Sequence, residues 1–199
     1  MAGSFPISTA NFESLGIKSI QNTIISKTVS GKKLARQIDG QRWGFTAKVI
    51  TAKRSDVYGE LMAFIIKQRS GKENFTIVPP EVEDARGTAS GTPNGTASAG
   101  ATSITLGGTG TGTLKAGDFI KFANHDKVYM VVADQSDIST GSLTIEPPLT
   151  TAVSSSDIQY DNVPFTVYLT NDIQEFGIVG ADKDGNALYQ FEFDVEESL

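Results

Sequence analysis

The sequence contains one histidine, His125, which could act as a general base or bind a metal ion. It stands between Asn124 and Asp126, in a segment predicted to be a hairpin turn. There is no cysteine and no second histidine to complete a metal site or a catalytic triad. We therefore expect an exposed turn residue without catalytic function.

A glycine-rich stretch at 107–112 has the composition of a phosphate-binding loop. Such a loop needs a helix directly after the glycines, and a Walker loop needs a Lys next to Ser or Thr. Here Thr113-Leu114-Lys115 leads into a predicted strand. We expect a flexible turn.

Acidic residues form two further candidate clusters. Residues 182–186 begin like a calcium loop, but Gly185 occupies position 4, and Phe193 stands where an EF-hand needs Glu. Asp-Gly and Gly-Asn pairs favour a β-hairpin turn instead. The spacing of Asp118, Asp134 and Asp137 pairs no acid with a base. The sequence thus predicts no catalytic residue, no metal ligand and no cofactor, and the protein is not expected to be an enzyme.

Composition narrows the class of protein. Absence of cysteine rules out disulfides and fits synthesis in a reducing cytoplasm. The N-terminal residues show no signal-peptide pattern, and no apolar run reaches the ~18 residues of a membrane span. The net charge of -6 divides unevenly: +5 over residues 1–86, -4 over 87–161 and -7 over 162–199. Because the basic residues are scattered, we expect the segments to neutralise one another, within one domain or across a subunit interface.

The elements around these residues are mostly strands. Strands are predicted at 17–30, 34–40, 42–50 and 75–78, and the third alternates strictly, with Trp43, Phe45, Ala47 and Val49 on one face. One helix is predicted at about 55–69 by an apolar stripe that Met62 and Ile66 widen, with Ser55 as N-cap and Gly71 as stop.

The chain then changes character. Residues 87–100 contain no large apolar residue and predict a Gly/Thr/Ser-rich linker. Five short strands are expected in the segment that follows, at 103–106, 119–122, 128–133, 143–145 and 158–160.

After residue 162 the pattern of the first part returns, with alternating strands at 165–169, 175–179 and 188–196. We infer a split β domain, 1–86 and 162–199, into which 87–161 is inserted as a small β-barrel or sandwich.

Three stretches resemble the distal tail proteins of long-tailed bacteriophages. Arg36 and Gly40-Gln41-Arg42-Trp43 match the family's first strand pair, and a helix closed by Gly71 follows. The middle stretch matches the family in residue type and order. It comprises Ala116-Gly117-Asp118-Phe119, then Tyr129-Met130-Val131, and finally Ile145-Glu146-Pro147-Pro148-Leu149. The resemblance covers roughly residues 16–195 through short motifs.

This resemblance implies a mainly β fold: a β-sandwich-like tail-tip domain with one helix, plus the inserted domain. It implies a virion protein at the tail tip, made in the host cytoplasm, that forms a homo-oligomeric ring, commonly a hexamer. The ring joins the tail tube protein to the hub and tape-measure proteins and the host-adsorption apparatus. DNA would pass through its lumen without specific binding.

A heterologous ring needs two complementary faces on each subunit, and the charge asymmetry could supply them. The expected contacts run between basic and acidic side chains of the same or a neighbouring subunit. These candidate interface charges are Arg36, Arg42, Lys53, Arg54, Asp194, Glu196 and Glu197.

Two other functions stay open. One is a carbohydrate-binding host-attachment module, although Phe119 and Tyr129 lie in strand patterns and are expected in a core. The other is a tail tube or tube-terminator ring protein, whose subunits stack on themselves.

Overall fold

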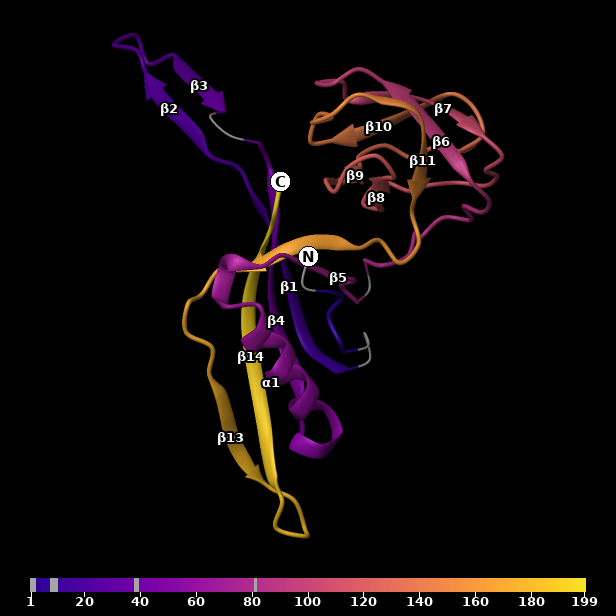
Figure 1. The fold of residues 1–199 in the computed structure, drawn as a ribbon. Coiled ribbons are helices and arrows are strands. Elements are labelled where there is room, and N and C mark those ends of the chain that lie inside the picture. Colours follow the sequence, from indigo (N-terminus) through magenta and orange to yellow (C-terminus); the bar gives the residue numbers. More distant parts are fainter. Residues whose placement is uncertain (1–2, 8–10, 38–39, 81) are drawn as a thin grey trace.

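The computed structural model describes residues 3–7, 11–37, 40–80 and 82–199. Figure 1 shows a long twisted sheet, a hairpin that projects from one end of it, and a barrel attached at its side. The mainly β fold with one α-helix is confirmed. The motif residues Ile38 and Asp39 lie outside the described residues.

The large sheet has six antiparallel strands in the order β1-β4-β14-β12-β5, with β13 paired to β14. Their bounds are Phe12–Ile20 (β1), Arg42–Lys53 (β4), Ala187–Glu197 (β14), Phe165–Leu169 (β12), Phe75–Ile77 (β5) and Phe176–Ala181 (β13). The C-terminal strands thus complete the sheet that the N-terminal strands begin. The predicted alternation in β4 is confirmed, because Trp43, Phe45, Ala47 and Val49 are all buried.

The helical segment packs on this sheet. A π-helical turn, Arg54–Tyr58, leads into α1, Gly59–Lys67, and a 3-10 turn at Ser70–Lys72 follows. Leu61 and Ile65 are buried, whereas Ile66, expected to widen the apolar stripe, is 70% exposed.

The predicted helix ends were wrong. The N-cap of the π-helical turn is Lys53, and its side chain makes no capping hydrogen bond. The hydroxyl of Ser55, the predicted N-cap, instead donates to the Asp56 carboxylate. At the C-terminal end, Arg69 and Ser70 adopt the left-handed backbone conformation, and they precede Gly71, the predicted stop. An added Cβ on Gly71 would lie 2.6 Å from the Leu169 carbonyl oxygen, so this glycine allows a close approach to β12.

The inserted segment is a closed barrel rather than a sandwich. Its strands follow one another around the barrel as β10-β7-β6-β11-β8-β9. Their bounds are Pro93–Ala97 (β6), Ser103–Gly108 (β7), Phe119–Phe122 (β8), Val128–Val131 (β9), Ser142–Glu146 (β10) and Val153–Gln159 (β11).

Strand β6 corrects the linker prediction for residues 87–100. Its residues lack large side chains because the strand crosses a crowded part of the barrel. A Cβ on Gly95 would lie 2.7 Å from Ile104 Cγ2 and 2.8 Å from Phe122 Cε1. Close packing, and not flexibility, therefore accounts for glycine at this position.

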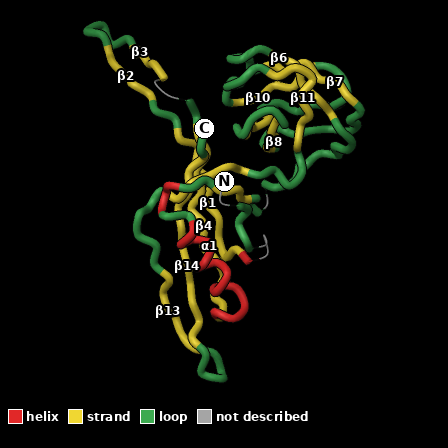
Figure 2. The backbone as a smooth tube through the Cα atoms, in the orientation of Figure 1, coloured by secondary structure: helices red, strands yellow, loops and turns green. Residues whose placement is uncertain are grey.

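Between β1 and β4 the chain forms a separate two-stranded hairpin, β2 (Thr23–Lys27) and β3 (Lys33–Gln37). The single strand predicted from residue 17 is thus broken at 21–22. Every residue from 21 to 37 is exposed, so the hairpin stands clear of both cores (Figures 1 and 2).

Candidate functional site: the barrel junction and the exposed assembly surfaces

A buried charged cluster joins the barrel to the sheet. Glu197, at the end of β14, is fully buried and forms an ion pair with Lys127, just before β9. The same carboxylate accepts hydrogen bonds from the backbone N–H of Val128 at 2.9 Å and of Trp43 at 3.1 Å. Lys127 Nζ also donates to Gln41 Oε1 at 2.9 Å.

Burial controls the ionisation of this pair. It raises the pKa of Glu197 and lowers that of Lys127, while their mutual attraction opposes both shifts. Each charge is tolerated in the interior only because the other is present and the polar atoms around it are hydrogen-bonded.

Apolar contacts surround the cluster. The Trp43 indole N–H donates to the Val128 carbonyl at 2.9 Å, and its ring meets Phe119 edge to face with centroids 5.0 Å apart. Phe119 and Val128 belong to the barrel strands, yet they pack in the core of the sheet. The barrel and the sheet therefore share part of one core.

The candidate catalytic residues have structural roles. His125 is half-buried rather than exposed, and its two ring nitrogens lie 2.8 Å from Asn124 Oδ1 and from the Tyr129 hydroxyl. Its pKa is lowered, first by burial and then by the charge of Lys121. Sequence spacing could not reveal this contact with Tyr129, four residues away on the next strand.

The other motifs also stabilise local structure. The flexible turn predicted at 107–112 is wrong in part, because Gly107 and Gly108 end strand β7 and pair with Asn94 and Pro93. Asp182 caps the β13–β14 turn by accepting from the N–H groups of Asp184 and Asn186, both at 2.8 Å. The turn prediction is confirmed. No cluster of His, Asp and Glu able to hold a metal ion occurs in the described part of the chain.

The three separate carboxylates serve loops of the barrel. Asp118 accepts from the backbone N–H groups of Arg86 and Lys115, Asp134 pairs with Lys115, and Asp137 accepts from Ser139. Asp118 and Asp134 share Lys115 as a partner, and all three carboxylates serve to hold loop backbone or a neighbouring side chain in place.

Most of the predicted interface charges have partners within the chain. Arg42 and Glu196 form a salt bridge at 2.9 Å, and Lys53 pairs with Asp182 at 2.5 Å. Asp194 accepts from Thr46 and pairs with Lys18 at 3.1 Å. Glu197 is the buried partner of Lys127.

Arg36 and Arg54 are exposed. Arg36 lies on β3 of the projecting hairpin, and Arg54 opens the helical segment. Among the salt bridges of the described residues, none joins Arg36 or Arg54 to the acidic residues at the end of β14.

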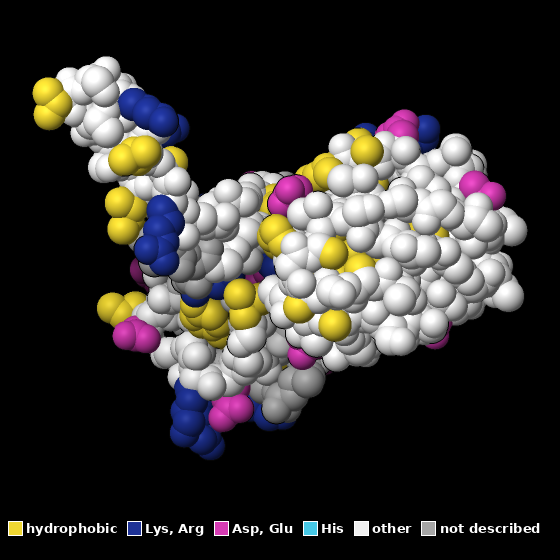
Figure 3. Space-filling view, turned by 90° about the horizontal axis from the view of Figure 1, so that it is seen from above, with side chains coloured by type: hydrophobic (Ala, Val, Ile, Leu, Met, Phe, Trp, Pro, Cys, Tyr) yellow, Lys and Arg dark blue, Asp and Glu magenta, His cyan; other side chains and the backbone are white. Residues whose placement is uncertain are grey.

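Exposed apolar side chains lie mainly on the sheet part, which here means residues 1–86 and 162–199 with the hairpin included. Among the described residues, all the large hydrophobic side chains of this kind except Val132 lie outside the barrel. Several of them project from the hairpin beside lysine and arginine side chains (Figure 3). They are Ile17, Ile24, Ile25, Val29, Leu34, Ile66, Ile173, Ile178, Val179 and Leu199.

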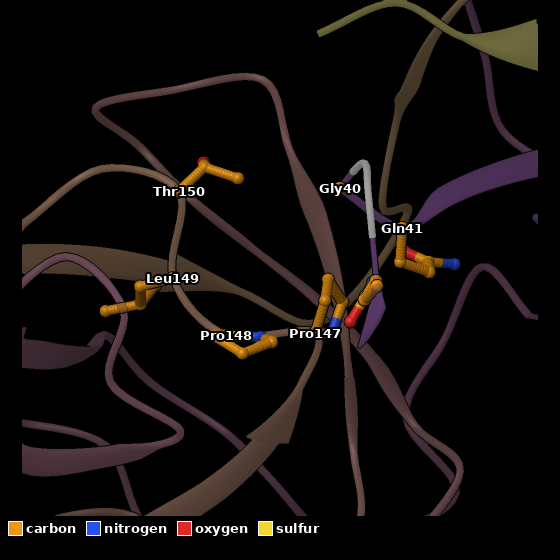
Figure 4. Close-up of a pocket in the computed structure, with 7 residues that line it drawn as sticks. Gly40, Gln41, Pro147, Pro148, Leu149 and Thr150 are labelled. Carbon is orange, nitrogen blue, oxygen red and sulfur yellow. The ribbon is translucent and has the colours of Figure 1, made fainter. Parts of the chain in front are cut away.

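A depression lies between the base of the hairpin and the barrel (Figure 4). Its volume is about 340 Å³, and Gly40 and Gln41 face the segment Pro147–Thr150 across it. The Gln41 side chain is already bonded to Ser19, Lys127 and the Arg42 carbonyl. The Gln41 amide is thus already occupied by contacts within the chain.

The aromatic residues of the barrel are buried. Phe119, Phe122, Tyr129 and Tyr160 are each at most 6% exposed, which confirms the expected core positions of Phe119 and Tyr129. Sugar-binding surfaces use exposed aromatic faces, and these four rings supply none.

Comparison with known proteins agrees with this fold. Residues 83–163 match the family model described as "Distal tail protein pb9, B domain", which spans the barrel and its two connections to the sheet. No curated protein matches the chain.

The match supports the resemblance to bacteriophage distal tail proteins and identifies the barrel as a B domain of this type. The matched family is one of structural phage tail proteins, and a domain of this type suggests a phage tail-tip structural protein. The described residues include no helix long and apolar enough to cross a bilayer.

Proposed function

We propose that the chain assembles into a closed homo-oligomeric ring, most simply a hexamer, at the distal end of a phage tail tube. The ring joins the tail tube protein to the hub and tape-measure proteins and the host-adsorption apparatus, and DNA passes through its lumen without base-specific contacts. The split part, 1–86 and 162–199, forms the ring, and the inserted part, 87–161, faces outward.

The distribution of exposed apolar surface carries this proposal. Monomeric proteins rarely expose large contiguous apolar patches, and such patches mark sites where other proteins bind. Here it lies almost wholly on the sheet part, while the described surface of the barrel shows only Val132. The sheet part is therefore the better candidate for contacts between subunits.

The candidate interface charges divide into two groups in this proposal. Arg42, Lys53, Asp194, Glu196 and Glu197 stabilise the subunit itself through their contacts within the chain. We assign Arg36 and Arg54, the exposed members of the set, to contacts with other subunits.

The molar mass in solution tests this function, measured by light scattering on a size-exclusion column at low and high salt. Six chains of 21.2 kDa give about 127 kDa, and three give about 64 kDa. A discrete mass of this kind supports a ring, whereas open-ended growth favours a tube protein. A monomer at every concentration would contradict self-assembly of the isolated protein.

A further inference from the structure

The β2–β3 hairpin exposes both its faces and both its edges. Ile24 and Leu34 lie on one face and Ile25 and Ala35 on the other, as the register Ile24↔Arg36 and Ile25↔Ala35 requires. Ile24, Ile25 and Leu34 are each at least 50% exposed. In the described part of the chain, neither strand pairs with any strand outside the hairpin.

An isolated two-stranded hairpin is at best marginally stable in water. This hairpin also leaves isoleucines in solvent and two edges with unpaired backbone groups, features that natural proteins usually cover or protect. A partner that covers one face and pairs with one edge would remove both costs.

The hairpin is strongly basic. Residues 21–37 carry Lys27, Lys32, Lys33 and Arg36 and no acidic residue. No salt bridge of the described residues involves these four side chains. The partner surface should therefore combine an apolar strip, an open strand edge and negative charge.

Strand β13 offers all three features. It pairs only with β14 among the described strands, so its other edge is open. Ile178 and Val179 are 64% and 55% exposed, and a Cβ on Gly180 would meet nothing within 4 Å. The edge is therefore not crowded by side chains.

The flanks of β13 are acidic. Asp172, Glu175 and Asp184 are exposed, and none of them occurs in a salt bridge of the described residues. The hairpin and β13 project at opposite ends of the subunit (Figure 1), so one chain cannot bring its own hairpin to its own β13.

We propose that the β2–β3 hairpin of one copy adds to the β13 edge of a second copy of this chain, and this inference rests on the proposed ring. Strand addition supplies backbone hydrogen bonds, and Ile24 and Ile25, on opposite faces of the hairpin, pack against the exposed apolar side chains of β13, Ile178 and Val179. The contact joins two different surfaces, so it is heterologous, as a ring requires. The opposite charges favour this pairing over hairpin with hairpin.

Cross-linking of single-cysteine variants tests the contact, because the natural chain contains no cysteine. Ile25→Cys protein is mixed with Val179→Cys protein and treated with a short bismaleimide. The matched control mixes Ile25→Cys with Ile66→Cys, whose site on α1 is 70% exposed. All three sites are exposed, and circular dichroism verifies folding.

We expect a cross-linked dimer in the first mixture at several times the yield of the control. If the two mixtures give equal yields and the wild-type protein is multimeric by light scattering, the hairpin contact is overturned and the ring remains. If the two mixtures give equal yields and the wild-type protein is monomeric, both proposals are contradicted.

A charge-reversal pair adds a second test. Lys33→Glu should lower the cross-linking yield about two- to five-fold, in line with one exposed ion pair. Asp184→Lys introduced into the partner population should restore it. If the combination is no better than Lys33→Glu alone, charge pairing does not guide the contact.

Discussion

Glu197 and Lys127 place two opposite charges at positions that solvent does not reach. Removing one member leaves the other buried and unpaired, which usually costs about 3–5 kcal/mol. We therefore expect Lys127→Met to lower the free energy of unfolding by about this amount. Denaturation in urea, followed by circular dichroism, measures the change.

Two further variants show whether the unpaired charge is responsible. Adding Glu197→Gln to Lys127→Met should regain part of the loss, because no unpaired charge remains in the interior. The recovery is incomplete, since the amide has one acceptor oxygen, whereas the two carboxylate oxygens accept separately from the N–H groups of Trp43 and Val128. Lys115→Met removes an exposed salt bridge to Asp134 and should cost at most about 1 kcal/mol. Equal losses from Lys115→Met and Lys127→Met would contradict the role of burial.

Asp182 is a second residue whose ionisation matters. Hydrogen bonds from Asn186 and Lys53, and from the turn amides, lower its pKa well below the usual value of 3.8. A lowered pKa in the folded state means that the ionised form stabilises the turn above pH 3.8, and that this stability disappears as the pH falls toward the folded-state pKa.

Carbon NMR of the Asp182 carboxyl should therefore show titration below 3.8. Lys53→Gln should move this pKa upward, since it removes one of the groups that favour the ionised form. Titration at or above 3.8 in the wild-type protein would show that the turn does not hold the carboxylate as described.

At the level of elements, strand β6 depends on Gly95. A side chain here would overlap Ile104 and Phe122, and overpacking a core usually costs about 1–3 kcal/mol. We expect Gly95→Val to destabilise the barrel by this order, measured by urea unfolding. The matched control is Gly180→Ala in β13, where nothing lies within 4 Å. The control should stay within about 0.5 kcal/mol, and equal effects would refute the packing argument.

Elements with a clear period were predictable from the sequence. The alternation of β4 and the apolar stripe of α1 identify their buried faces, because burial on one side imposes the period. Strand β6 was missed since its sequence, Pro-Asn-Gly-Thr-Ala, carries no periodic apolar residue, and only its neighbours in space explain the glycine. After the C-terminal end of the helix, Gly71 lies close to the Leu169 carbonyl of β12, and no local pattern encodes this contact.

The junction could not be predicted for a related reason. Lys127 and Glu197 are 70 residues apart, and each looks like an ordinary surface charge in the sequence. Trp43 was expected in a core, and it is, but its hydrogen bond to Val128 depends on how the barrel meets the sheet. Long-range contacts of this kind follow from the complete fold.

At the scale of the whole molecule, the shared core predicts that barrel and sheet unfold together. Domains within a chain usually move relative to one another unless their interface is large and apolar. Here Phe119 and Val128 pack in the core of the sheet, and the buried ion pair crosses the same junction. Trp43 is the only tryptophan, so its fluorescence reports on that junction.

We expect the fluorescence of Trp43 and the far-ultraviolet circular dichroism of the full chain to change at the same urea concentration. Lys127→Met weakens the junction first, so in this variant the fluorescence change should come at lower urea than the loss of strand signal. The Lys115→Met protein should keep the two curves together. Two separate transitions in the wild-type protein would mean that the barrel moves independently, and the proposed ring would then carry a flexibly attached domain instead of a fixed one.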